Sequence, residues 1–319
     1  MIRPKIIVLF TSYLCNARCA MCYIWKKQGV SPQLSAGDID RIFSNAFFNK
    51  NTEIINLTGG EPTLRPDLLD IVDILVKRCR NLKRIDMPTN GINTNLAMDK
   101  IEAILTRLLP TDVKLAVTVS VDGVDGVHEA VRGVPGIFKN VENTIKEIKE
   151  ISVFWPGLYF GVNATIGKLN FDKLSEIKEY GRRNQVGVNF TLGAISEIGV
   201  ESVEMKDNFL LTASERAYVA DFFEENIKDK TINEKYGSLA IELLRKGRRQ
   251  PLCAFRAGKA ILIEPDGNVY LCGNYKEFFI GNALKEKTEV IAKNAAGIKG
   301  SKWNKCFSCE SNCYIDEVL

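Results

Sequence analysis

The sequence predicts an α/β fold with a parallel sheet of six strands, followed by a smaller cysteine-rich region. Over residues 5–192, short apolar segments alternate with amphipathic helices, which is the pattern of consecutive βα units. After residue 250, helical periodicity fades while glycine and cysteine recur. Six βα units form either an open, incomplete barrel or a doubly wound sheet, and both place their chemistry at the carboxyl ends of the strands.

The individual elements follow from periodicity and from boundary residues. The segment 113–121 is apolar almost throughout, as expected for a strand buried on both faces. In the helix that begins at Pro66, the apolar residues share one side. We expect strands at 5–10, 53–57, 83–87, 113–121, 158–166 and 187–192. We expect helices at 38–48, 66–79, 96–109, 137–151 and 171–184, and charged helices at 213–228 and 233–246.

Composition narrows the class of protein. Of the 319 residues, 45% are hydrophobic and 26% are charged, which is typical of an ordinary globular chain. The net charge of +4 is too small to indicate a nucleic-acid partner, and no apolar run approaches the length of a membrane span. The nine cysteines are clustered, and about 170 residues after Cys79 contain none. Clustered cysteines without a secretion signal indicate metal ligands, so we expect a cytoplasmic protein without nucleic-acid or membrane partners.

Three of these cysteines, Cys15, Cys19 and Cys22, lie within eight residues directly after the first apolar segment. Three thiolates can hold three irons of a [4Fe–4S] cluster and leave the fourth iron open for another ligand. Structural zinc sites need four ligands, so this group alone does not suit zinc. The alternative is three unrelated buried cysteines.

Polar motifs follow the next strands at the same edge of the predicted sheet. Gly59-Gly60-Glu61-Pro62 follows the second strand, Thr89-Asn90-Gly91 the third, and Ser120, Asp122 and Gly123 end the fourth. Glycine lets backbone approach a ligand closely, and either Glu61 or exposed backbone can receive an ammonium group. The alternative for Gly59–Pro62 is a plain tight turn before a helix.

The cysteine spacing and the Gly-Gly-Glu-Pro motif together resemble the radical S-adenosylmethionine (SAM) superfamily, over residues 5 to about 192. The resemblance implies a partial (β/α)6 TIM barrel, a [4Fe–4S] cluster, and SAM chelated to its open iron. It implies cofactor-binding residues at Gly59, Gly60, Glu61, Asn90, Ser120, Arg132 and Asn163. Met21 departs from the aromatic residue that many members carry there, but its thioether can pack against adenine.

The C-terminal cysteines are Cys253, Cys272, Cys306, Cys309 and Cys313. Residues 260–271 predict a β-hairpin with its turn at Pro265-Asp266-Gly267-Asn268, which brings the first two of these cysteines together. Four thiolates can hold a second cluster or a structural zinc ion. The spacing resembles the SPASM/twitch extension of radical SAM enzymes, which implies an auxiliary [4Fe–4S] cluster with one cysteine to spare.

The resemblance implies a radical SAM enzyme of the oxidoreductase or epimerase type, with a core at 1–196, a helical connector at 197–250 and an auxiliary-cluster domain at 251–319. It implies a 5′-deoxyadenosyl radical that takes a hydrogen atom from an unactivated carbon. The substrate is expected to be a small molecule such as a sugar or aminocyclitol, because strand 1 begins near residue 5 and leaves no room for a leader-recognition domain.

Other functions and roles remain open beside this one. A ribosomally made peptide is the alternative substrate, and a non-catalytic iron–sulfur electron carrier is the remote alternative. We expect flavodoxin or ferredoxin as the reductant. His128, the only histidine, is expected to orient its loop, and Cys79 to be a buried hydrophobic residue.

Overall fold

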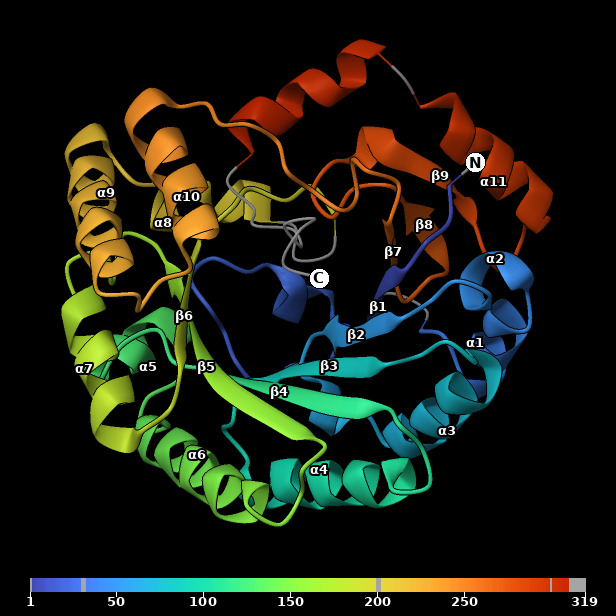
Figure 1. The fold of residues 1–319 in the computed structure, drawn as a ribbon, viewed down its shortest axis with the longest axis horizontal. Helices are drawn as coiled ribbons and strands as arrows, with labels where there is room; N and C mark the ends of the chain where they lie inside the picture. The colour runs from blue at the N-terminus through green and yellow to red at the C-terminus, as the bar shows by residue number, and fades with distance from the viewer. Residues whose placement is uncertain (1, 30–32, 199–201, 299, 310–319) are drawn as a thin grey trace.

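In the computed structural model, residues 2–29, 33–198, 202–298 and 300–309 are described. Six parallel strands form an arc with helices along its outer side (Figure 1). These strands are β1 (Ile6–Ser12), β2 (Ile54–Gly59), β3 (Arg84–Thr89), β4 (Lys114–Ser120), β5 (Leu158–Ile166) and β6 (Val188–Leu192). The prediction of a partial (β/α)6 barrel is confirmed, and each predicted strand lies within two residues of its observed bounds.

The helices cover the outside of the arc and its open edge. The helices of the barrel are α1 (Ala36–Phe43), α2 (Ala46–Asn49), α3 (Leu68–Arg78), α4 (Thr94–Leu108), α5 (Gly126–Arg132), α6 (Phe138–Ser152) and α7 (Leu174–Asn184). Beyond them lie α8 (Lys206–Phe209), α9 (Ala213–Lys228), α10 (Glu234–Lys246) and α11 (Thr288–Gly297). Within the described ranges, no helix combines the length and apolar character needed to cross a membrane.

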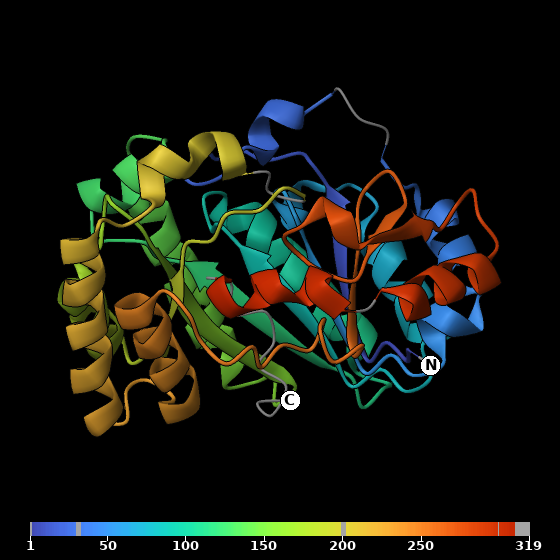
Figure 2. The same ribbon diagram turned by 90° about the horizontal axis from the view of Figure 1, so that it is seen from above.

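The C-terminal strands continue the same sheet. They are β7 (Ala260–Ile263), β8 (Asn268–Tyr270) and β9 (Phe279–Asn282), and the full strand order is β6-β5-β4-β3-β2-β1-β7-β8-β9. Strand β7 pairs in parallel with β1, while β7 with β8 and β8 with β9 pair antiparallel. The predicted hairpin is therefore present. Viewed from above, α9 and α10 stand at the opposite end of the molecule from α11 (Figure 2).

The two faces of the barrel strands differ in chemistry. Residues such as Ile85, Met87 and Val117 are fully buried in the core beneath the outer helices. The residues between them face the cavity enclosed by the arc and are often polar, as at Asp86 and Thr118. Because successive side chains of a strand point to opposite faces, one strand supplies both the core and the cavity wall.

Three local predictions were wrong. The helix expected over 38–48 is two helices, because the Asn45 side chain accepts a hydrogen bond from Phe47 N (3.0 Å) and caps a new helix there. The loop expected around His128 is helix α5, which ends at Gly133 with a φ of 65°. Helix α11 and strand β9 were not predicted.

Candidate functional site

The loop after β1 gathers Cys15, Cys19 and Cys22 in a largely buried place. Burial is the main cause that raises the pKa of Cys15 to about 11 and of Cys22 to about 12. Charge on Cys19 would raise both values further, so the three sulfurs are neighbours. A thiolate here needs a nearby positive charge to be stable, and bound metal supplies one.

The number of thiols in this loop suits an iron–sulfur cluster. A structural zinc site takes four protein ligands, and the loop supplies three cysteines. An iron–sulfur cluster spreads its cysteines over different irons, and three thiols leave one iron open to another ligand. The donor set therefore fits a cluster.

Gly59 and Gly60 join the loop after β2 to the cysteine loop by close backbone contact. A Cβ on Gly60 would lie 2.0 Å from Leu14 O, and one on Gly59, whose φ is +121°, would lie 2.4 Å from Ser12 O. Gly60 N donates to Ser12 O (2.8 Å), and Glu61 N donates to Leu14 O (2.7 Å). Only glycine permits this approach, so the two motifs singled out in the sequence are parts of one structure.

The Glu61 carboxylate is committed to the protein itself. It is 3% exposed and accepts hydrogen bonds from Thr63 N, Thr63 Oγ1, Thr89 Oγ1 and Asn90 N. Burial raises its pKa, and these donors oppose that shift. Of the two options left open for an ammonium ligand, the structure favours the exposed backbone over this side chain.

Asn90 ties the end of β3 to the cysteine loop. Its Nδ2 donates to Asn16 Oδ1 (2.7 Å), and its own Oδ1 accepts from Ile92 N (3.0 Å). The residue is 6% exposed. Its position therefore holds the neighbouring loops of β1, β2 and β3 in one arrangement.

Ser120 and Asn163 are direct neighbours on β4 and β5, and both line the central cavity. The Asn163 amide donates to Thr191 Oγ1 (3.2 Å) and accepts from Asn189 Nδ2 (2.9 Å). Cys22 lines the same cavity, so the predicted cofactor residues of β4 and β5 share one space with the cysteine loop.

Arg132 on α5 is buried against the cysteine loop. Its Nε lies 2.6 Å from Asp122 Oδ2, and its Nη1 lies 3.6 Å from Cys19 Sγ. The backbone of α5 also accepts from the cysteine loop, with Arg18 N donating to Arg132 O (2.8 Å). Asp122 was not among the predicted site residues, although its position at the end of β4 was a signal for it.

His128 serves as a buried neutral acceptor. Its Nδ1 accepts from Asp122 N (3.2 Å), and burial, with Arg132 nearby, lowers its pKa to about 3. The ring is therefore uncharged near neutral pH, which suits the orienting role expected for it. Cys79 is 2% exposed within the hydrophobic core, as expected for a small apolar residue.

A second group of four cysteines converges in the C-terminal part. Burial is the main cause that raises the pKa of Cys272 to about 12 and of Cys306 to about 11. Charge on Cys253 or Cys309 would raise both pKa values further, so the four thiols are neighbours. Cys313, the fifth predicted ligand, lies outside the described residues. Of the four thiols that the structure brings together, Cys253 precedes β7 and Cys272 follows β8. Cys306 lies in the 3₁₀ helix Gly300–Ser308, and Cys309 directly follows that helix.

A cavity of about 870 Å³ lies inside the arc and reaches both cysteine groups. It touches Cys22 on one side and Gly273 and Asn274, which follow Cys272, on the other. Its wall is rich in amides and hydroxyls and contains one carboxylate, Asp86, paired with Arg84 (2.5 Å). Sequence reasoning missed this wall, although polar residues recur at every second position of the strands as a signal.

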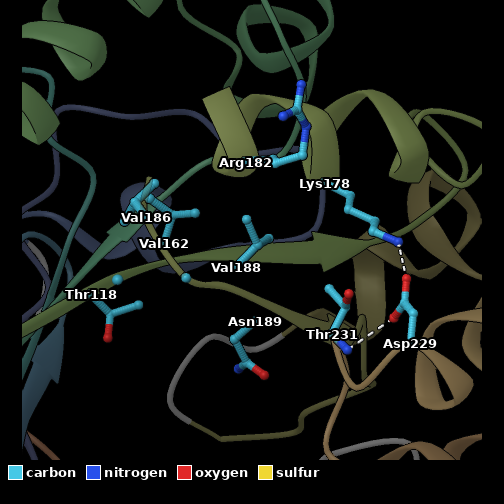
Figure 3. Close-up of a pocket in the computed structure, with 11 residues that line it drawn as sticks. Thr118, Val162, Lys178, Arg182, Val186, Val188, Asn189, Asp229 and Thr231 are labelled. Atoms are coloured by element: carbon cyan, nitrogen blue, oxygen red, sulfur yellow. Dashed lines mark hydrogen bonds and ion pairs between the residues drawn. The ribbon is translucent and has the colours of Figure 1, made fainter. Parts of the chain in front are cut away.

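A second hollow of about 780 Å³ adjoins this cavity between β5, β6, α7 and the α9–α10 turn (Figure 3). Lys178 and Asp229 form an ion pair at its rim, and Asp229 also accepts from Thr231 N (3.0 Å). The two spaces share four lining residues, Thr118, Val188, Asn189 and Thr231. The two spaces are therefore neighbours across these residues.

The N-terminal half of the chain is similar to known proteins. The family model described as "Radical SAM superfamily" matches residues 9–163. The sporulation killing factor maturation protein SkfB of Bacillus subtilis is 28% identical over 165 residues, which are 52% of this chain and 36% of SkfB. A GTP 3′,8-cyclase of Synechococcus elongatus is 31% identical over 184 residues, which are 56% of this chain and 51% of the cyclase. The chain thus spans about half or less of these curated relatives.

Solved structures share the fold over nearly the whole chain. Native anSMEcpe with bound AdoMet has a TM-score of 0.65 at 18% identity and covers 95% of this chain and 87% of its own. Streptococcus suis SuiB bound to the precursor peptide SuiA has a TM-score of 0.60 at 15% identity, covering 100% and 73%. At these identities the likeness concerns the fold, and it extends to the C-terminal strands.

Proposed function

The chain belongs to the radical SAM superfamily through residues 9–163, and we propose that it uses SAM to abstract a hydrogen atom from a substrate held in the central cavity. Cys15, Cys19 and Cys22 hold a [4Fe–4S] cluster in this proposal. When bound, that cluster supplies the electron that cleaves SAM to a 5′-deoxyadenosyl radical. The observation that carries the proposal is the packing of the Gly59-Gly60 backbone against the cysteine loop, beside the cavity.

Several residues of the chain have separate roles in binding SAM and in balancing charge at this site. In this proposal the backbone carbonyls at Gly59 and Gly60 accept from the amino group of SAM, because the N–H groups of Gly60 and Glu61 already donate to the cysteine loop. Ser120 and Asn163 line the cavity and face the ribose of SAM. Arg132 places a guanidinium beside Cys19, where it balances negative charge. Flavodoxin or ferredoxin serves as the electron donor, and the protein works in the cytoplasm, where thiols stay reduced.

The substrate we propose is a small polar molecule, such as a sugar or aminocyclitol, that is dehydrogenated or epimerised. The amides and hydroxyls of the cavity wall suit a ligand with many hydroxyl groups. Dehydrogenation removes one hydrogen atom and then a proton and an electron. Asp86 bears the one carboxylate among the described residues that line the cavity, and burial raises its pKa. We therefore propose that Asp86 accepts the proton that the substrate loses.

A peptide substrate is the second candidate, favoured by the hollow that adjoins the cavity. The shared wall at Thr118 and Asn189 extends the available space toward α7 and the α9–α10 turn. A chain of several residues needs such an extension, whereas a single sugar ring does not. The same hydrogen-atom abstraction then leads to an epimer or a cross-link.

We assign Cys253, Cys272, Cys306 and Cys309 to a second [4Fe–4S] cluster. When bound, it supplies an acceptor for the electron that dehydrogenation releases. Zinc is the alternative ion for four cysteines. The resemblance of the cysteine spacing to the SPASM/twitch extension supports the cluster over zinc.

Cleavage of SAM tests the central proposal. Reduced protein mixed with SAM should form 5′-deoxyadenosine, and replacing Cys15, Cys19 and Cys22 together by alanine should abolish it. Continued cleavage by the triple variant would refute the assignment. About eight irons per chain after anaerobic reconstitution are expected for two clusters, since each holds four. Four irons with one zinc would contradict the second cluster.

Mass spectrometry in deuterated water separates the reactions. A product lighter by about two mass units indicates dehydrogenation, and one heavier by about one indicates epimerisation with solvent hydrogen. Asp86→Asn should still form 5′-deoxyadenosine while losing the dehydrogenated product. Full product yield in that variant would remove Asp86 from the mechanism.

A further inference from the structure

Asn274 lines the central cavity and also contacts sulfurs of the C-terminal cysteine group. It is 6% exposed. Its backbone N–H donates to Cys272 Sγ (3.4 Å), and its side-chain Nδ2 donates to Cys309 Sγ (3.3 Å). One residue thus contacts two ligand sulfurs that lie far apart in the sequence, and its side chain spans the gap between them.

The amide of Asn274 is oriented for negatively charged sulfur. A thiolate accepts hydrogen bonds, and of the two ends of an asparagine amide only the nitrogen donates. The nitrogen faces Cys309. The residue is also fixed by its backbone, because its carbonyl accepts from Glu197 N (2.6 Å), and the preceding Gly273 carbonyl accepts from Ser196 Oγ (3.2 Å). Glu197 and Ser196 belong to the segment after β6, so the contact joins the barrel to the C-terminal strands.

We propose that Asn274 is a positioning residue that raises the reduction potential of the C-terminal cluster through its two N–H···S contacts. This inference rests on the proposed second cluster. Reduction adds negative charge to a cluster and its thiolates, and donors pointing at sulfur stabilise that charge. Because Asn274 also forms cavity wall, a molecule in the cavity that displaces its amide changes the same potential.

The size of the effect follows from the one contact that the side chain makes. The contact acts on the potential through the difference in its strength between the reduced and the oxidised cluster. Losing the Cys309 contact while keeping the backbone contact should change the ratio of reduced to oxidised cluster about tenfold at a given ambient potential. For a one-electron couple this equals about 59 mV.

The test uses full-length protein carrying Cys15, Cys19 and Cys22 replaced by alanine, so that one cluster is left to titrate. After anaerobic reconstitution, its midpoint is measured by redox titration with electron paramagnetic resonance. In this background Asn274→Leu should lower the midpoint by about 59 mV, the tenfold change above. Asn294→Leu is the matched control, because Asn294 donates to Ile280 O in the same region and touches no cysteine among the described contacts; its midpoint should not move.

Two further variants guard against a loss of folding. Asn274→Asp keeps the shape but replaces the donor by a charged acceptor, and it should lower the midpoint more than leucine does. Asn274→Gln keeps an amide and should restore part of the shift. A midpoint unchanged in both the leucine and the aspartate variants, each with four irons, would overturn the inference. Zinc, or no iron, in the cysteine-to-alanine background would instead refute the second cluster itself.

Discussion

Replacing Gly60 by alanine should disrupt the close backbone contact between the cysteine loop and the Gly59-Gly60-Glu61-Pro62 turn. The new Cβ would lie 2.0 Å from Leu14 O and 2.5 Å from Leu14 C, and backbone atoms cannot turn aside as a flexible side chain does. The loops must separate, which weakens the hydrogen bonds Gly60 N to Ser12 O and Glu61 N to Leu14 O. Each is worth about 1 kcal/mol, and local overpacking adds about 1–3 kcal/mol.

The expected loss in the free energy of unfolding is therefore about 3–5 kcal/mol, with a fall in Tm of about 4–8 °C for a chain of this size. Urea unfolding followed by circular dichroism measures it on anaerobically reconstituted protein. The variant should also lose most 5′-deoxyadenosine formation, because the cysteine loop shifts with the glycine.

Gly126→Ala is the matched control for this experiment. No atom lies within 4 Å of a Cβ at Gly126, which begins α5 without a positive φ. Alanine there should leave stability unchanged or raise it by about 0.4–1 kcal/mol, by restricting the unfolded chain. A Gly60→Ala protein as stable as the wild type would show that the close approach of the two loops does not hold the site.

Three further outcomes are expected. The folded pKa of His128, about 3, lies below its unfolded value of 6.5, so the unfolded chain binds the proton first as pH falls. Stability should drop by about 1.6 kcal/mol from pH 6.5 to pH 5, and His128→Gln should remove that drop in urea titrations at the two pH values. Asp122→Asn leaves the buried Arg132 guanidinium without its 2.6 Å partner and should cost about 3–5 kcal/mol in the same assay; a loss under about 1 kcal/mol would contradict a structural ion pair. Cys309→Ala should lower the iron content of the reconstituted protein, whereas Cys79→Ala, in the hydrophobic core, should not; equal losses in the two variants would contradict the role of Cys309 as a ligand.

The strands and the cysteine loop could be predicted because their signals are local. An apolar run bounded by polar motifs can be recognised from residues that are consecutive in the sequence. For this reason β5 was predicted at its observed bounds, Leu158–Ile166. Helix α5 was missed because glycines stand before, at the start of and after it, and such glycines usually indicate a loop. Its stability comes from packing against the cysteine loop, where Gly133 allows Arg18 O to approach.

The cavity wall was missed for a different reason. The alternation of Asn56 with Leu57 and of Asp86 with Met87 was visible, but a strand pattern does not say that the polar face turns into a shared space. That requires the arc of six strands. In the same way, the contact of Asn274 with Cys309 joins residues that are distant in sequence, and no local pattern indicates it.

The pairing of β7 with β1 affects the order of events during synthesis. Ile6 is paired with Ala260, so β1 waits for its second neighbour until the chain as far as β7 has left the ribosome. Contacts between such distant residues form late, because the intervening chain must first be ordered. Until then the cysteine loop that continues from β1 stays beside an unpaired sheet edge. Under the ligand assignment proposed above, we expect the thiols of Cys15, Cys19 and Cys22 to be open to iron–sulfur delivery before the last strands dock.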